Sequence, residues 1–210
     1  MASKIDIWNA AIAKLGQDVR VTSPSENTKH ARTLNVAWQR VLDFVLADAV
    51  WTFALRHKAL ALSTEETLGW GYRYDYPSDC LKAVVVCDAG GVRQYRDAIV
   101  RGEAITPEFE VQGGAQGQTI VADIEAAYLI YVERVNDTGR FTPKFIEALA
   151  CRLAADIAPV VAGEIGIRLS PELERRYVAM KETGTADAFN EGSEPILIPA
   201  SPTLAARGGA

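Results

Sequence analysis

Apolar residues recur at helical spacing near both ends of the chain and at alternating positions between them. In the first segment the apolar positions are Ile5, Trp8, Ile12 and Leu15. Ser3 and Asp6 are spaced as in a capping box, and Gly16 is typical of a left-handed helix end. The pattern predicts a helix over residues 3–15.

A longer apolar stripe predicts a second helix over residues 26–49, with Ser25 as its N-cap. Its apolar positions are Ala31, Leu34, Trp38, Val41, Leu42 and Val45. At a rise of about 1.5 Å per residue, such a helix spans roughly 35 Å. We therefore expect it to pair with other helices in a bundle.

Between about residues 51 and 135 the helical period gives way to alternation, glycines and turn residues. Aromatic residues occupy every second position at Trp70, Tyr72, Tyr74 and Tyr76, so a strand would place four rings on one face. Other strands are predicted at 57–62, 81–87, 109–111, 119–122 and 127–132. Residues 89–91 are expected to form a hairpin-type break and residues 113–117 a hairpin loop.

Helical signals return after residue 140. The expected helix has Thr142 as its N-cap and Pro143 as its first residue, and Phe141 precedes the cap as a hydrophobic staple. The apolar positions that follow are Phe145, Leu149, Leu153 and Ile157. Ser170 and Pro171 repeat the start signal and predict a fourth helix.

These elements predict an α+β fold: a four-helix bundle with an antiparallel β module inserted between helices two and three, plus an extended C-terminal tail. The helical bundle would comprise residues 1–50 and 136–189, the β module residues 51–135, and the Pro-rich tail residues 190–210. The tail contains one apolar trio, Ile196, Leu197 and Ile198. It is either a disordered end with chance hydrophobes or an arm that docks on a neighbour, by strand addition or in a groove.

Composition and charge narrow the function classes. The 210 residues carry a formal charge of −5, and no basic stripe suggests a nucleic-acid grip. Cys80, Cys87 and Cys151 lack metal-ligand or redox spacing, and the apolar settings of Cys80 and Cys151 predict buried thiols, which fits a reducing cytoplasm. Neither a signal peptide nor an apolar run long enough to span a membrane is recognisable.

No set of residues with catalytic or cofactor-binding spacing is found. His30 and His57 are the only histidines, and neither has a second ligand or a nucleophile at a useful spacing. We therefore expect no enzymatic activity, no metal and no cofactor.

Four segments together resemble the tail tubular protein A family of tailed phages, the head-to-tail adaptors. They are Ala2–Gly16, Trp51–Arg56, Tyr74–Val84 and Phe145–Ala155. The resemblance implies a structural virion protein, assembled in the host cytoplasm, that forms a ring, typically a dodecamer, between the portal protein and the tail or nozzle protein. DNA would pass through the ring only as cargo, and the family has no enzymatic activity or cofactor.

Two functions remain open at this stage. In the adaptor, we expect the interface to include Trp51, Phe53, Arg56, Tyr72 and Tyr74, together with the tail residues Ile196, Leu197 and Ile198. The alternative is a non-enzymatic binding or regulatory module that uses the aromatic strand face, by protein contact or by stacking bases. If the aromatic row packs in the core instead, its rings are not available to a ligand and the binding-module hypothesis loses its surface.

Overall fold

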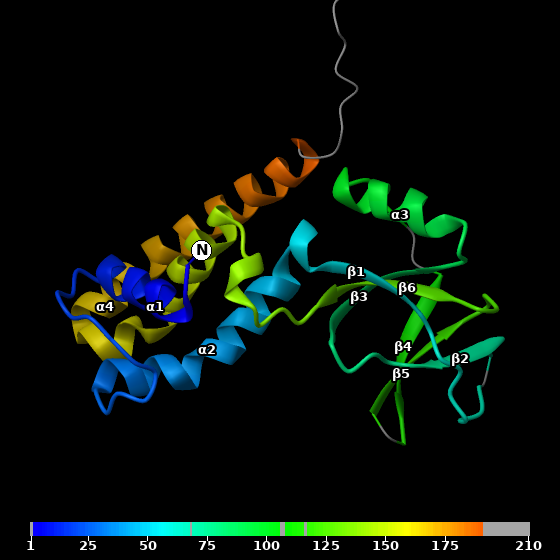
Figure 1. Ribbon diagram of the computed structural model, residues 1–210, viewed down its shortest axis with the longest axis horizontal. Helices are drawn as coiled ribbons and strands as arrows, with labels where there is room; N and C mark the ends of the chain where they lie inside the picture. Colours follow the sequence, from blue (N-terminus) through cyan, green and yellow to red (C-terminus); the bar gives the residue numbers. More distant parts are fainter. Residues whose placement is uncertain (1, 68, 106–107, 116, 191–210) are drawn as a thin grey trace, which may run out of the picture.

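Helices gather at one end of the molecule and strands at the other (Figure 1). The computed structural model describes residues 2–67, 69–105, 108–115 and 117–190. At the helical end lie α1 (Lys4–Lys14), α2 (Lys29–Asp48) and α4 (Pro143–Asn190). The other end holds six strands and α3 (Gly91–Val100). Two short 3₁₀ helices, η1 (Thr52–Ala54) and η2 (Thr138–Arg140), lie in the connections between the two ends.

The N-terminal helix follows its local sequence signals. The Ser3 hydroxyl accepts a hydrogen bond from the Asp6 amide at 3.2 Å, and the Asp6 carboxylate accepts one from the Ser3 amide at 2.8 Å. This confirms the predicted capping box. Gly16 has φ +67°, the left-handed conformation predicted for the helix end.

The second helix begins later than predicted. Its N-cap is Thr28, whose hydroxyl accepts a hydrogen bond from the Ala31 amide at 3.2 Å. Ser25 was the wrong cap, because its own amide donates to Ser23 in the preceding turn. The apolar stripe is confirmed: Ala31, Leu34, Trp38, Val41, Leu42 and Val45 are all buried.

The last helix, α4, is a hairpin of two helical halves that meet at Gly163, where φ is 57° and ψ is −133°. The predicted start at Thr142 and Pro143 is confirmed, since the Thr142 hydroxyl accepts from the Phe145 amide at 3.4 Å. The predicted second start at Ser170 is wrong. Ser170 lies inside the second half and donates to the Ala155 carbonyl at 3.1 Å.

The halves of α4 run antiparallel and close together near the kink. Lys144 at the start of the helix donates to the Thr183 carbonyl near its end, at 3.2 Å. Nearer the kink, a Cβ built on the buried Gly166 would overlap the Ala158 carbonyl. Glycine is therefore needed at residue 166 for the two halves to approach.

Replacing Gly166 by alanine is expected to lower the free energy of unfolding by about 2 kcal/mol, because the added methyl group has no space beside the Ala158 carbonyl. Urea unfolding measures the change. Gly113→Ala is the matched control, since a Cβ there meets nothing within 4 Å. Equal effects of the two substitutions would show that α4 does not turn at this point.

The six strands form two three-stranded antiparallel sheets. Sheet A has the order β1 (Leu55–Ala59), β6 (Tyr128–Glu133), β3 (Cys80–Cys87). Sheet B has the order β2 (Tyr72–Asp75), β5 (Gly117–Ala122), β4 (Phe109–Gly114). The loop predicted at residues 113–117 lies at the β4–β5 hairpin, but it was predicted too long, because Gly113, Gly114 and Gly117 belong to the strands.

Alternation along β6 assigns its residues to different cores. Leu129 and Tyr131 pack between the two sheets, with Tyr74 and Ile120 from sheet B. Ile130 faces the other way, where α3 covers sheet A. The strand end of the molecule thus has three layers: α3, sheet A and sheet B.

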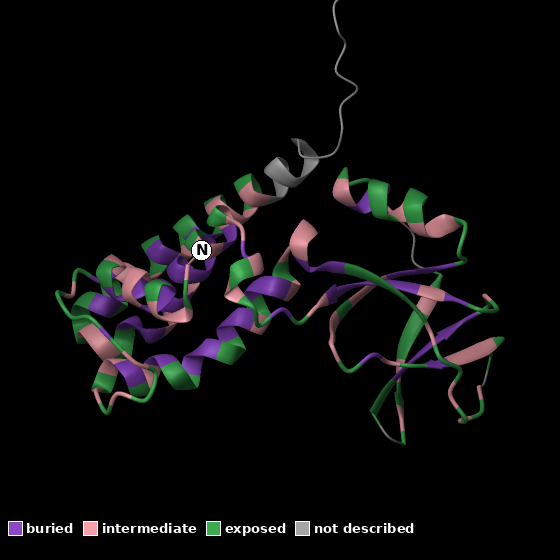
Figure 2. Ribbon diagram, in the orientation of Figure 1, coloured by how far each residue is buried: buried purple, intermediate pink, exposed green. Residues whose placement is uncertain are grey.

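The helical end holds the largest core. Figure 2 shows buried residues along the inward sides of its helices. Trp8 and Trp38 meet edge to face, with ring centroids 6.3 Å apart. Val132 and Val135 also belong to this core, so the end of β6 joins the helical and strand ends.

The predicted fold class is wrong in its topology. The described residues form four α-helices, the last of them long, and two separate sheets, and not a four-helix bundle with one inserted module. A third helix, α3, interrupts the strands, so that β4, β5 and β6 lie between helices three and four. The proposed division at residues 50 and 136 stays a prediction, and the tail prediction for 191–210 lies outside the described residues.

Candidate protein interface

Two of the predicted interface residues lie in an aromatic cluster between the helical and strand ends. The cluster comprises Trp51, Phe53, Phe141 and Phe145. Trp51 and Phe145 meet edge to face at 4.9 Å between centroids, as do Phe53 and Phe145. Trp51 is 3% exposed, and its indole N–H donates to the Val45 carbonyl at 2.8 Å. In a single chain these two residues therefore stabilise the fold, and Trp51 has little surface to offer a partner.

Arg56, a third predicted interface residue, is held by an ion pair beside this cluster. Its guanidinium lies 2.9 Å from the Glu133 carboxylate, which also receives Arg140 at 2.9 Å. Arg140 donates in addition to the Phe53 carbonyl at 2.7 Å. Burial alone would raise the pKa of Glu133, but the hydrogen bonds and charges of both arginines outweigh it and lower the pKa.

Because the pKa of Glu133 is lowered, the wild type should be more stable than Glu133→Gln at neutral pH, and this difference should disappear in acid. Glu133→Gln is expected to lower the free energy of unfolding by about 1 kcal/mol at pH 7, where the carboxylate is paired. As the pH falls below 4.5, the ordinary value for glutamate, and through the lower folded-state pKa, the wild type loses this contribution. Urea unfolding over a pH series measures both curves, which should converge. Parallel curves into strong acid would contradict the pairing.

The aromatic strand residues lie between the two sheets. Tyr74 is 0% exposed and its hydroxyl donates to the Ile124 carbonyl. Tyr72 stacks on it at 6.3 Å between ring centroids, and Tyr76 packs against the same core. Burial raises the pKa of the Tyr74 phenol. The ring of Tyr74 is therefore not presented on the surface of a single chain. Ile196, Leu197 and Ile198 lie outside the described residues.

The thiols give no sign of reactive chemistry in this fold. Burial raises the pKa of Cys80, Cys87 and Cys151, so each favours the neutral thiol. Within the described ranges, no group of three His, Cys, Asp or Glu side chains could hold a metal ion. Among the helices of the same ranges, none is long and apolar enough to cross a membrane.

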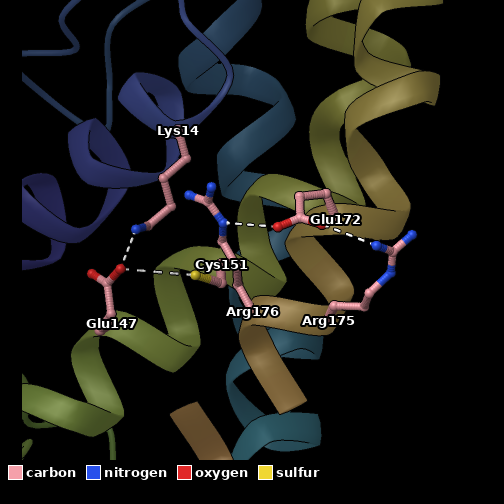
Figure 3. Close-up of polar contacts among 6 residues, drawn as sticks. All are labelled: Lys14, Glu147, Cys151, Glu172, Arg175 and Arg176. Atoms are coloured by element: carbon pink, nitrogen blue, oxygen red, sulfur yellow. Dashed lines mark hydrogen bonds and ion pairs between the residues drawn. The ribbon is translucent and has the colours of Figure 1, made fainter. Parts of the chain in front are cut away.

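An ion pair joins α1 to the first half of α4, and further ion pairs connect residues within its second half (Figure 3). Lys14 of α1 pairs with Glu147 of the first half, and Glu147 also approaches the Cys151 sulfur at 3.9 Å. On the second half, Glu172 pairs with Arg175 at 3.2 Å and with Arg176 at 3.4 Å. The charged groups of these residues are thus paired within the chain.

An apolar hollow of 460 Å³ lies between α2 and the first half of α4. We call it the α2–α4 groove; it is lined by Arg32, Thr33, Val36, Ala37, Arg40, Asp156 and Val160. Val36 is 83% exposed and Val160 is 51% exposed. The Arg40 guanidinium lies 2.6 Å from the Asp156 carboxylate and joins the two helices across the groove. The groove can therefore receive an apolar side chain.

The sequence interpretation missed this groove, although a signal was present. Val36 lies outside the apolar stripe of α2, two residues after Leu34 and two before Trp38, where a core helix ordinarily carries a polar residue. Two more exposed apolar side chains, Ile165 at 66% and Ile167 at 59%, follow the kink of α4. Apolar residues exposed at one end of a molecule often mark a contact surface.

Comparison with known proteins gives no family for this chain. No model of a known protein family matches it, and no curated protein matches its sequence.

Proposed function

We propose that this chain is a structural virion protein of a tailed phage, a head-to-tail adaptor that forms a ring between the portal and the tail and lets DNA pass. The observation that carries the proposal is the α2–α4 groove, which leaves Val36 and Val160 in contact with water in a single copy. Apolar surface of this kind is stabilised when another protein covers it. The likeness of four chain segments to the adaptor family supplies the kind of assembly.

The partners follow from that role. They are the portal protein on one side, the tail or nozzle protein on the other, and further copies of this chain in a ring, a dodecamer by resemblance. No cofactor takes part, and the protein would be located in the virion. The net charge of −5 supports a ring that DNA crosses without binding, because like charges keep a polyanion from adhering.

The alternative, a binding module built on the aromatic strand face, has weaker support. It needs exposed rings, whereas Tyr74 is 0% exposed and Tyr72 stacks on it. We therefore advance the adaptor function alone.

Co-expression with the portal protein of the same genome tests the proposal. The full chain is expected to co-purify with a tagged portal in a fixed ratio. A chain that ends at residue 190 should assemble less well yet melt at nearly the same temperature, because the described cores are formed before that residue. Unfolding of the shortened chain would instead place residues 191–210 in the core, and failure of the full chain to bind any portal would contradict the proposal.

A further inference from the structure

The α2–α4 groove has a specific occupant within this sequence. We propose that Ile196, Leu197 and Ile198 of one copy dock in the α2–α4 groove of a second copy. The inference rests on the self-association part of the proposed function and adds to it which segment binds which surface.

The first argument is the groove itself. Its lining includes the apolar side chains of Val36, Ala37 and Val160, and Val36 is the most exposed large apolar side chain among the described residues. The Arg40–Asp156 ion pair is already complete at 2.6 Å. A ligand therefore gains most by covering the valines with apolar side chains.

The second argument is reach, which excludes the chain's own tail. The antiparallel halves of α4 place Ser170 beside Ala155, level with the groove residue Asp156. From Ser170 to the helix end at Asn190 is about 30 Å at 1.5 Å per residue. Ile196 lies six residues beyond Asn190, which is at most about 22 Å of extended chain, and even Ile198 reaches at most about 29 Å. Val160 lies one further turn, about 6 Å, beyond Asp156 and away from the helix end, so the trio can cover the valines of this groove only on another copy.

The third argument is chemical fit. The trio is the apolar part of residues 190–199 and stands between Pro195 and Pro199. Prolines restrict the free segment, so less conformational entropy is lost when it binds. Glu191 and Glu194 precede the trio, and no Lys or Arg follows before Arg207. This acidic stretch suits Arg32, an exposed groove residue whose guanidinium donates to a neutral group, the Asn27 amide oxygen, at 2.9 Å.

The placement of the two surfaces determines the kind of assembly. In the sequence the tail follows Asn190, the last residue of α4, whereas the groove residues Asp156 and Val160 lie close to the kink at Gly163. Each copy thus offers its tail to one neighbour and its groove to another. Such a head-to-tail contact repeats, and it closes into a ring when the rotation allows.

Disulfide trapping between two differently marked full-length chains tests the contact. Val36→Cys is made in one chain and Leu197→Cys in the other, and the mixture is oxidised and separated without reductant. A covalent heterodimer is expected. The matched control is Val178→Cys in place of Val36→Cys, because Val178 is also exposed, at 42%, and lies outside the groove. Equal dimer yields with the two partners would overturn the proposal.

Two further variants give the direction of the contact and its dependence on apolar burial. A chain that carries both Val36→Cys and Leu197→Cys should form a ladder of trimers and larger species. Closure within a monomer would show docking in the same chain, and products that stop at dimers would show reciprocal exchange; either result would overturn the head-to-tail arrangement. Adding Ile196→Ser to the Leu197→Cys chain should reduce the heterodimer at least about tenfold, since serine loses most of the apolar area that would cover the valines.

Failure of this inference is distinguishable from failure of the proposed function. If Leu197→Asp chains still assemble on the portal as the wild type does, the adaptor function stands and the docking inference falls. If the heterodimer forms but the wild type never joins a portal, the docking stands and the adaptor function falls.

Discussion

Replacing Trp51 by alanine is expected to lower the free energy of unfolding by about 4 kcal/mol. The indole is 3% exposed, contacts the Phe145 ring edge to face at 4.9 Å, and donates to the Val45 carbonyl at 2.8 Å. A Cβ built on Gly184 would lie 2.6 Å from the same indole, so the second half of α4 also packs on it. Trp51 therefore joins the end of α2 to both halves of α4, and its removal leaves a cavity at this junction.

Urea unfolding of the full chain measures this loss. Trp51→Phe is the control: it keeps most of the apolar area but loses the hydrogen bond, and should cost about 1 kcal/mol. If Trp51→Ala were as stable as the wild type but failed to assemble, Trp51 would have no core role and would instead be an interface residue, as the sequence predicted.

Replacing Tyr74 by serine is expected to lower the free energy of unfolding by about 4 kcal/mol. The ring is 0% exposed between the two sheets, and its hydroxyl donates to the Ile124 carbonyl. Serine would leave a cavity there and an unpaired carbonyl. The result separates a core role from the binding-face hypothesis, which requires Tyr74 to be dispensable for folding.

Tyr74→Phe and Tyr72→Ser are the controls for this substitution. Tyr74→Phe keeps the ring and should lose about 1 kcal/mol for the hydrogen bond. Tyr72→Ser should lower the free energy of unfolding less than Tyr74→Ser does, because Tyr72 is only partly buried. If Tyr74→Ser folded normally and abolished binding of a ligand, the sheet packing described above would be wrong.

Helix ends that depend on interactions between residues at most four apart could be predicted from the sequence. The capping box of Ser3 and Asp6, the left-handed Gly16, and the start of α4 at Thr142 and Pro143 were each predicted and are confirmed. In each case the groups that satisfy one another are neighbours in the chain. Tertiary packing does not have to be known to identify them.

The errors occur where one local signal permits two structures. Gly90 and Gly91 suit a hairpin turn, but the Asp88 carboxylate accepts from the Gly91 amide at 2.6 Å and α3 begins there. Similarly, Ser170 and Pro171 suit a helix start, yet they lie inside the second half of α4. The turn instead falls at Gly163, where the positive φ and the close approach at Gly166 allow the two halves to pack.

The rest of the fold and most of the candidate site depend on pairing between residues far apart in the sequence, and could not be predicted from it. Tyr72 pairs with Ala122, fifty residues later, and this register buries Tyr74 between the two sheets, with Tyr72 and Tyr76 partly buried against the same core. Alternation along a strand cannot show which strand it pairs with. The α2–α4 groove likewise depends on where α4 packs against α2, although the off-stripe Val36 gave a partial signal.

Imaging of the chain co-expressed with the portal protein of its own genome tests the central claim most directly. Negative-stain electron microscopy of the purified complex should show a second annulus stacked on the portal ring, with a symmetry that can be counted. A bare portal ring beside free monomers of this chain would contradict the adaptor account.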